Sequence, residues 1–252
     1  MTATATLRRA ALAAAFAMPF AVSAFADEMI PTSDGDVTLH PIHHAALTLT
    51  YKGVVVLADP APLGQSNDPA ADFTGLPAPQ IILITHEHGD HFNVDVLKAV
   101  SAEATIVVPQ SVFDKLPADL QAKAKVMKNG DTLALSGITI EAVPEYNITA
   151  DRLKFHPKGR DNGYVLTFGD KRIYIAGDTE DTPEMRALKD IDVAFLPMNL
   201  PYTMDVEHAA DAIRAFKPKV VYPYHYGDSD LKPLAGLVGD ASEVKLLDWY
   251  PK

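Results

Sequence analysis

The chain contains no cysteine among its 252 residues. This absence excludes disulfide bonds, thiolate metal ligands and a cysteine nucleophile, and it is compatible with an oxidising compartment. Positive charge is also scarce, because 22 lysines and arginines stand against 33 acidic residues and leave a net charge of −11 at pH 7. No basic cluster interrupts this acidic balance. The sequence therefore predicts neither a nucleic-acid-binding surface nor a special attraction to anionic membranes.

Long apolar runs are absent except at the N-terminus. There Arg8-Arg9 precedes the apolar stretch 10–22, and the small-residue pattern Ser23-Ala-Phe-Ala26 follows. A basic, an apolar and a small-residue segment in this order are typical of a cleavable secretory signal. We expect residues 1–26 to be a signal peptide and the mature chain to be periplasmic or secreted, with no stable membrane insertion. The alternative is an uncleaved anchor, but the apolar run is short for a membrane-spanning helix.

The mature residues 27–252 predict one domain, because 48% hydrophobic content is enough for a large core. Residues 27–35 have the character of a flexible lead-in, and residues 144–162 that of a polar loop. Hydrophobic patterning predicts strands at 36–40, 45–51, 54–58, 81–84, 105–108, 125–127, 132–135, 138–143, 163–168, 171–176, 193–196, 219–222 and 244–247. It predicts helices at 93–100, 111–116, 117–123, 181–189 and 206–216. Two successive strand sets, each finished by helices, indicate an α/β fold of two face-to-face sheets with helices outside.

The densest polar cluster directly follows the predicted buried strand Ile81–Ile84. It contains His86, His88, Asp90 and His91 within six residues. A loop past a strand end can gather its side chains onto one point, and imidazole with carboxylate suits zinc and its first-row neighbours. His86 and His88 can bind one ion, while Asp90 and His91 can turn toward a second. A chance polar loop is the alternative, but three of the nine histidines fall here beside an aspartate.

Three other polar clusters follow predicted strand ends. Gly177-Asp178 places one carboxylate after a strand, and His225 follows another strand among tyrosines. The polar loop 144–162 offers Asn147 and His156. Taken singly, Asp178 has the properties of a turn or helix-capping residue and His225 those of a packed structural histidine. Only their combination with the histidine cluster favours a metal site.

Together these residues resemble the metallo-β-lactamase superfamily. The resemblance rests on His86-x-His88-x-Asp90-His91, on Asp178 after a glycine, and on His225 near the end of the chain. It implies a four-layer αβ/βα sandwich with the metal site at one edge of the two sheets. It also implies that His86 and His88 bind a first ion, that Asp90, His91 and His225 bind a second, and that Asp178 bridges them. Among its branches, the lactonase-like hydrolases of ascorbate 6-phosphate and the N-acylphosphatidylethanolamine phospholipase-like hydrolases are most similar.

The sequence departs from that family at one ligand. The family supplies a third first-site histidine from a strand end downstream of the cluster, where this chain has Pro144-Glu-Tyr-Asn147. His156, nine residues further on, can take that place, and we favour it over Asn147. If neither residue binds, the first site is weak and the enzyme works with one tightly held ion.

The resemblance implies hydrolysis of a small-molecule substrate by a metal-bound hydroxide, with Asp90 and Asp178 as catalytic carboxylates. We expect two divalent ions, with zinc as the first choice and manganese or iron as alternatives. An ester or lactone substrate ranks first, and a phosphodiester or phospholipid ranks second. A true β-lactamase is disfavoured by the missing histidine. The alternative from another class is a non-catalytic periplasmic metal-binding protein.

Several neighbouring residues carry secondary expectations. His44 either orients a substrate oxygen or is structural. Asp59 is expected to support a ligand histidine by contacting the ring nitrogen of that histidine that does not face the metal. Glu87 lies between two ligands and should point away from the metals. The remaining histidines are expected at the surface: His40, His43 and His208.

Overall fold

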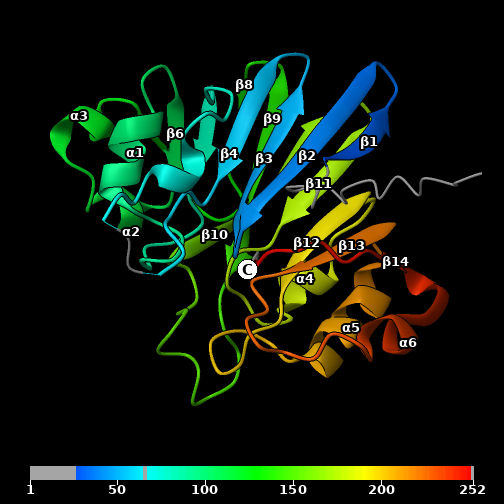
Figure 1. Cartoon of the computed structure of the whole chain (residues 1–252). Coiled ribbons are helices and arrows are strands. Elements are labelled where there is room, and N and C mark those ends of the chain that lie inside the picture. The colour runs from blue at the N-terminus through cyan, green and yellow to red at the C-terminus, as the bar shows by residue number, and fades with distance from the viewer. Residues whose placement is uncertain (1–26, 65–66, 251–252) are drawn as a thin grey trace, which may run out of the picture.

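The computed structural model describes residues 27–64 and 67–250, so the predicted signal peptide lies outside the described residues. Two seven-stranded sheets pack face to face (Figure 1). The first sheet contains β1 (Glu28–Thr32), β2 (Gly35–His43), β3 (Ala46–Tyr51), β4 (Val54–Ala58), β5 (Ile81–Leu83), β6 (Thr105–Val108) and β7 (Ala124–Val126). The second contains β8 (Thr132–Leu135), β9 (Ile138–Glu145), β10 (Asp161–Phe168), β11 (Lys171–Ile175), β12 (Val193–Pro197), β13 (Val220–Tyr224) and β14 (Glu243–Val244).

The two sheets repeat one topology. In each, strands that neighbour in sequence also pair in space, first antiparallel and then parallel. The antiparallel part of the first sheet ends at β4, and that of the second sheet ends at β11. Parallel strands need crossover connections, and these connections carry the helices. The polar residues of the later parallel strands are thereby delivered to the same sheet edge.

Helices cover the outer face of each sheet (Figure 1). The first sheet carries α1 (Val94–Val100), α2 (Gln110–Phe113) and α3 (Ala118–Gln121). The second carries α4 (Pro183–Arg186), α5 (Val206–Phe216) and α6 (Leu234–Val238). Asn93 caps α1, since its side chain accepts hydrogen bonds from the backbone N–H groups of Asp95 and Val96, both at 3.0 Å. None of the helices in the described part of the chain has the length and apolar character needed to cross a membrane.

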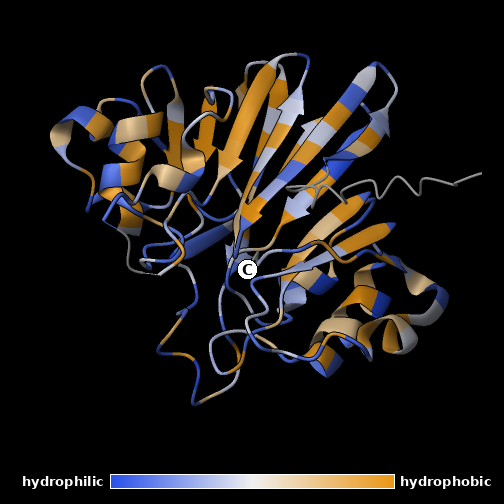
Figure 2. Ribbon diagram, in the orientation of Figure 1, coloured by the Kyte–Doolittle hydropathy of each residue, from blue (hydrophilic) through white to orange (hydrophobic). Residues whose placement is uncertain are grey.

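Three hydrophobic cores hold the four layers of the sandwich together. Strand side chains alternate between them: Ile81 and Leu83 of β5 belong to the core between the sheets, whereas Ile82 packs under the first helical layer. In β12, Phe195 faces the central core and Leu196 faces the second helical layer. Because the parallel strands are buried on both sides, most of their length is hydrophobic (Figure 2). The predicted four-layer αβ/βα sandwich is confirmed.

Two loop predictions are wrong for the same reason. Residues 27–35 contain β1, which pairs antiparallel with β2 through Met29 opposite Thr38. The polar loop 144–162 is shorter than predicted, because β9 continues to Glu145 and β10 begins at Asp161. In both places the hydrogen bonds of a neighbouring strand, and not a hydrophobic period, define the element.

Candidate metal centre

The polar residues singled out in the sequence meet at one edge of the sandwich. His86, His88, Asp90 and His91 occupy the loop after β5. Neighbouring strands bring further side chains to the same edge: His44 after β2, Asp59 after β4, Glu145 at the end of β9, Asp178 after β11 and His225 after β13. Residues far apart in sequence thus form one cluster because their strands end together.

His86, His88 and His156 form the first histidine group. One ring nitrogen from each lies within 4.8 Å of the others. The His156 ring centroid is 4.8 Å from that of His86 and 4.7 Å from that of His88. Three converging imidazoles are a suitable donor set for a first-row divalent ion. The structure therefore brings His156, which the sequence favoured over Asn147, together with His86 and His88.

Asn147 is buried near this group; its Nδ2 is engaged elsewhere, while its Oδ1 has no hydrogen-bond partner in the described chain. Its Nδ2 donates to the Tyr202 carbonyl at 2.7 Å and to the Arg152 carbonyl at 3.2 Å. Its backbone N–H donates to the His156 carbonyl at 2.8 Å. Asn147 thus anchors the loop that carries His156.

His44, Asp90, His91 and His225 form the second group. Asp90 Oδ2 lies 3.1 Å from His44 Nε2 and 3.4 Å from His225 Nε2. The Asp90 side chain is 48% exposed, whereas His225 and His91 are buried. The carboxylate therefore sits at the opening of the site. His44, whose role the sequence left undecided, is part of the cluster itself.

Asp178 lies between the two groups. Its Oδ1 is 3.3 Å from His91 Nε2, and its Oδ2 is 3.3 Å from His225 Nε2 and 3.6 Å from His156 Nε2. A single carboxylate that reaches both groups has the placement of a bridging ligand in a two-metal site.

Asp59 supports this arrangement from the end of β4. Its Oδ2 lies 2.8 Å from His91 Nδ1 and accepts a 2.8 Å hydrogen bond from the Thr85 hydroxyl, while its Oδ1 accepts from the Thr85 N–H at 2.8 Å. His91 Nε2 is left to face Asp178. A carboxylate on the second nitrogen fixes the tautomer and orientation of a ligating imidazole. The predicted contact of Asp59 with a cluster histidine is confirmed.

Glu145 is a part of the site that the sequence did not reveal. It is fully buried, its Oε1 accepts the Asp178 N–H at 2.8 Å, and the same oxygen lies 3.1 Å from His86 Nδ1. Burial, together with the carboxylates of Asp161 and Asp178, raises the pKa of Glu145 well above its ordinary value. The only sequence signal was a single glutamate beside Pro144, in a stretch assigned to a loop.

Three residues around the centre adopt left-handed backbone conformations that non-glycine residues rarely use. Their φ angles are 52° at His44, 43° at Asp59 and 43° at His225. Each lies just past a strand end, where the bend turns its side chain toward the cluster. Strained conformations of this kind concentrate at functional sites.

Gly177 permits the close approach of Glu145 to Asp178. Its φ is +67°, and a Cβ there would lie 2.2 Å from Glu145 Oε2. We expect Gly177→Ala to lower the free energy of unfolding by about 2–4 kcal/mol, from left-handed strain plus the displaced buried carboxyl. Chemical denaturation measures this change. Gly137→Ala is the matched control, because φ is +81° but no atom lies within 4 Å of the added Cβ. An equal loss of unfolding free energy in both variants would contradict the explanation that Gly177 is needed for the close packing of Glu145.

The charge states of the first histidine group and of Asp178 favour a cation, whereas in the second group Asp178 and Asp59 outweigh burial and raise the pKa of His91 well above its ordinary value. Burial lowers the pKa values of His86, His88 and His156, to about 4 for His156, so these rings are neutral at pH 7. Burial alone would raise the pKa of Asp178, but His225 and His91 hold it well below its ordinary value. Neutral imidazoles and ionised carboxylates are the forms that ligate metals.

Unpartnered atoms point to the same conclusion. Buried side-chain atoms without a hydrogen-bond partner in the described chain include Nε2 of His86, His91 and His156 and Oδ1 of Asp178. Leaving such atoms buried and unsatisfied is costly. Their convergence indicates that a bound species satisfies them, and the donor set of imidazoles and carboxylates fits divalent metal ions.

The remaining secondary expectations have mixed outcomes. Glu87 points away from the groups, 2.9 Å from Lys115 Nζ, as expected. His208 is exposed, and His40 is half-buried near Asp27. The prediction of a surface position for His43 is wrong, because it is 4% exposed and packs against Phe73.

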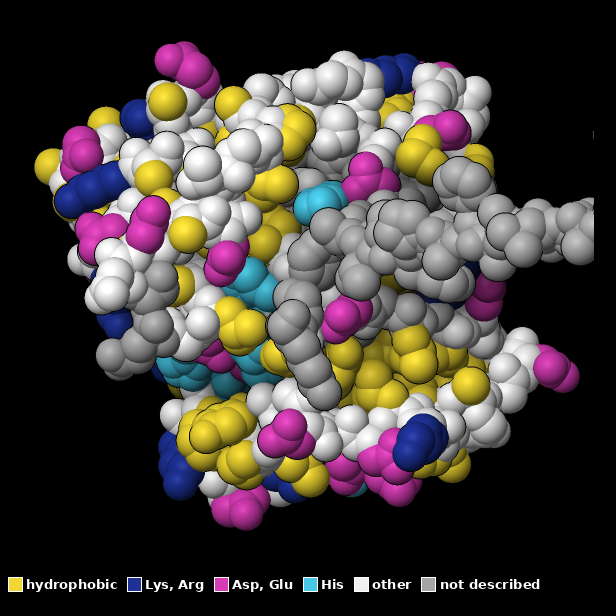
Figure 3. All heavy atoms as spheres, viewed as in Figure 1, with side chains coloured by type: hydrophobic (Ala, Val, Ile, Leu, Met, Phe, Trp, Pro, Cys, Tyr) yellow, Lys and Arg dark blue, Asp and Glu magenta, His cyan; other side chains and the backbone are white. Residues whose placement is uncertain are grey.

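A cavity of about 400 Å³ opens onto the two groups. Its lining combines metal-site residues with two aromatic rings: His88, Asp90, Phe155, His156, Asp178, Asn199 and Tyr202. Figure 3 shows histidine side chains gathered in a hollow on this face, with hydrophobic side chains directly beside them. None of the described residues that line the cavity is a lysine or an arginine.

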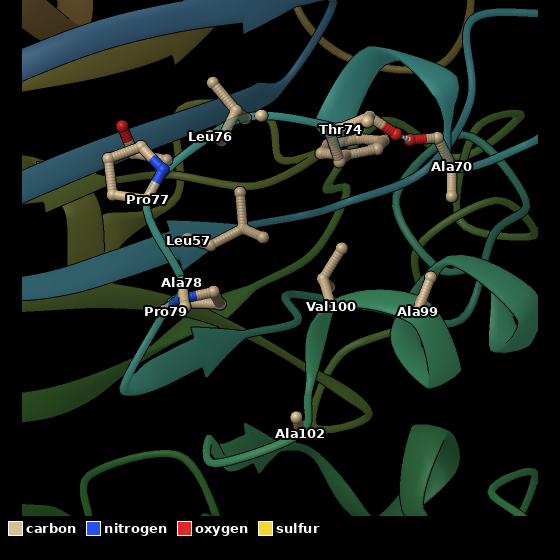
Figure 4. A pocket seen from close by; sticks show the side chains of 13 residues that line it. Leu57, Ala70, Thr74, Leu76, Pro77, Ala78, Pro79, Ala99, Val100 and Ala102 are labelled. Atoms are coloured by element: carbon tan, nitrogen blue, oxygen red, sulfur yellow. Dashed lines mark hydrogen bonds between the residues drawn. The ribbon is translucent and has the colours of Figure 1, made fainter.

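A second cavity, of about 310 Å³, has different properties. It lies between the Leu76–Pro79 segment, β4 and the end of α1 (Figure 4). Its lining contains no histidine and no carboxylate. It therefore carries none of the chemistry of the histidine groups.

Comparison with known proteins agrees with this geometry. Residues 38–225 match the model of the β-lactamase superfamily domain. The chain belongs to the metallo-β-lactamase superfamily. It is 33% identical to a UPF0173 metal-dependent hydrolase of Thermus thermophilus over 192 residues, which are 75% of this chain and 84% of the relative. A related UPF0173 metal-dependent hydrolase of Pyrococcus horikoshii is 31% identical over 176 residues, 66% of this chain and 77% of the relative.

Solved structures share this fold. A metal-dependent hydrolase of Parabacteroides distasonis is 46% identical, with a TM-score of 0.81, and the match covers 88% of this chain and 98% of that one. The metallo-hydrolase Igni18 of Ignicoccus hospitalis shares the fold at 24% identity and a TM-score of 0.69, over 84% and 94% of the two chains. The chain is a metal-dependent hydrolase of the metallo-β-lactamase superfamily. Its place in a lactonase-like branch stays a prediction.

Proposed function

We propose that this superfamily member hydrolyses a carboxylic ester or lactone of a small, uncharged molecule. The observation that carries the proposal is Asp178, whose carboxylate lies between two histidine groups with unpartnered ring nitrogens. The choice of an acyl bond rests on the cavity. A phosphate monoester or diester would gain from lysine or arginine at its oxygens, and the described residues that line this cavity include neither.

The ligand assignment follows the two groups. The first ion would be held by His86, His88 and His156, the second by Asp90, His91 and His225, and Asp178 would reach both. When bound, two such ions, with zinc as the first choice and manganese or iron as alternatives, supply Lewis acidity and a water that ionises near neutral pH. The third histidine of the first group would then be His156.

The two catalytic carboxylates, Asp178 and Asp90, have different roles. Asp178 is held ionised beside His91, so its unpartnered Oδ1 can accept a proton from an attacking water and deliver it to the leaving oxygen. Asp90 lines the cavity, and His44 and His225 hold its Oδ2. It fixes the orientation of the second group at the opening, where the substrate enters.

A substrate panel tests the proposal. The protein is loaded separately with zinc, manganese or iron and assayed with a 4-nitrophenyl ester, a simple lactone, bis(4-nitrophenyl) phosphate and a chromogenic cephalosporin. We expect ester or lactone turnover to exceed the other activities. Preferential phosphodiester cleavage would replace the acyl assignment. Stoichiometric metal without turnover of any probe would favour a non-catalytic metal-binding protein.

Tyr250 is expected to tune the second group through His44. Its hydroxyl lies 2.8 Å from His44 Nδ1 and accepts the Gly227 N–H at 3.0 Å, so it fixes the ring whose Nε2 faces Asp90. Tyr250→Phe should weaken binding of the second ion by roughly 10–100-fold, as measured by competition with a metal chelator. Tyr222→Phe is the control, since its hydroxyl contacts Glu28 at 3.3 Å instead. An unchanged affinity in Tyr250→Phe would refute this role.

We also propose that the mature domain, residues 27–252, acts in the periplasm or outside the cell. The support is the basic, apolar and small-residue order of residues 8–26. Expression of the full chain in a Gram-negative host should yield a periplasmic protein that begins at Asp27, as read by intact mass. Retention of residues 1–26 on a membrane-bound product would indicate an anchor instead.

A further inference from the structure

Two loops beside the metal centre expose an unusual amount of apolar surface. The loop after β9 carries Ile148 and Leu153, exposed by 47% and 46%, and the loop after β12 carries Leu200 and Tyr202, exposed by 44% and 46%. Figure 3 shows hydrophobic side chains next to the histidines on this face. Exposed apolar groups that gather at a site opening indicate binding.

The two loops form one braced platform. Asn147 Nδ2 donates to the Tyr202 carbonyl at 2.7 Å, and Arg152 pairs with Glu180 at 2.7 Å. Glu180 Oε2 in turn accepts the backbone N–H groups of Ile148 and Thr149, both at 2.6 Å. The apolar side chains are therefore presented from a fixed backbone.

Phe155 and Tyr202 connect this platform to the metal centre. Their rings pack edge to face, with centroids 5.1 Å apart and planes at 72°. Both line the cavity that also contains His88, His156 and Asp178. A substrate whose reactive carbonyl reaches Asp178 must therefore place its substituent against these rings or against the polar side of the cavity near Asn199.

We propose that Phe155 and Tyr202 bind an aliphatic acyl chain, so that the substrate is a medium-chain acyl ester or an alkyl-substituted lactone. This inference rests on the proposed function and names its substrate class. The same two loops that carry the ring pair also expose aliphatic side chains, namely Ile148, Leu153 and Leu200, so apolar surface beside the rings is available to a chain. An aliphatic chain of several carbons matches such a path better than a compact polar group does.

The charge of the surroundings argues against an anionic lipid surface as the occupant. A groove that shares Asn199 with the cavity is lined by four carboxylates: Asp205, Glu207, Asp228 and Asp230. The chain also carries a net charge of −11. Lys154 Nζ lies 5.0 Å from the Phe155 ring centroid, but the four carboxylates outnumber it, so this opening does not favour anionic headgroups and does not disfavour an uncharged chain in solution.

Calorimetric titration of the zinc-loaded protein with acetate, butyrate, hexanoate and octanoate tests the inference without requiring turnover. The carboxylate of each acid is expected to bind the metal ions, and its alkyl chain is expected to contact the rings of Phe155 and Tyr202. We expect roughly 4-fold tighter binding for each methylene that becomes buried. Tyr202→Ala should remove most of this increase in affinity with chain length, whereas Tyr202→Phe should retain it. Leu237→Ala is the matched control, because Leu237 is exposed by 37% on α6 and lies outside the cavity lining.

The outcomes are separable. Equal affinity for all four acids, with acetate bound and ester or lactone turnover present, would overturn the inference and leave the proposed function intact. Absence of both metal uptake and turnover would be a failure of the proposed function itself. If the protein bound phosphatidylcholine vesicles, but its affinity for the monomeric acids did not rise with chain length, the platform would be assigned to a lipid surface. That result would also overturn the inference.

Discussion

Asp178→Asn is expected to lower kcat/KM by roughly 10³-fold or more while the protein remains folded. The reason is geometric, since Asp178 is the carboxylate whose two oxygens lie within 3.3–3.6 Å of His91, His225 and His156. Asparagine has nearly the same shape, but it removes the charge between the groups and the acceptor for the proton of the attacking water. Steady-state kinetics on whichever acyl substrate the panel identifies measures the loss.

Asp181→Asn is the matched control for this variant. Asp181 is also buried and lies three residues further along the same loop, but its carboxylate pairs with Arg186. We expect near wild-type kcat/KM in Asp181→Asn, with thermal unfolding recorded for both variants. If Asp178→Asn kept more than a tenth of the wild-type activity, the proposed role of Asp178 would have to be abandoned.

His156→Ala is expected to weaken binding of the first ion by at least about 100-fold, because only His86 and His88 would remain in that group. The loss should appear as one ion fewer per chain after dialysis against a weak chelator, measured by elemental analysis. Occupancy of the second group should persist, since His91 and His225 are unchanged.

Asn147→Ala discriminates between the two residues that the sequence left as alternatives. It removes the side-chain hydrogen bond to the Tyr202 carbonyl, which is worth about 1 kcal/mol of stability. The backbone bond to His156 remains. We expect full metal content in Asn147→Ala. A reversed result, with metal lost from Asn147→Ala and retained in His156→Ala, would show that the first group has been assigned to the wrong residue.

Local sequence patterns were sufficient to predict most of the fold and the central residues of the candidate metal site. The strand before His86 is apolar and ends in a dense group of ligand types, so both element and chemistry are visible in a few residues. Asp178 and His225 were recognisable because each follows its own strand, and parallel strands deliver their ends to one edge. The four-layer architecture followed from two strand sets that each end in helices.

The missed features depend on tertiary contacts. Glu145 lies at the end of β9, where pairing with Asp161 of β10 extends a strand through Pro144. No local pattern distinguishes this glutamate from a loop residue. His43 is buried where Phe73, distant in sequence, packs against it, and β1 is a strand because β2 pairs with it. For His156, sequence distance suggested two possible ligands, and only the path of the loop distinguishes them.

The most direct test of the two-metal centre is elemental analysis of the mature protein after purification under metal-replete conditions. The arrangement of His86, His88 and His156 beside Asp90, His91 and His225, with Asp178 between them, predicts two first-row divalent ions per chain. A folded chain that takes up no divalent metal from a several-fold excess would contradict the two-metal centre and, with it, the proposed hydrolytic chemistry.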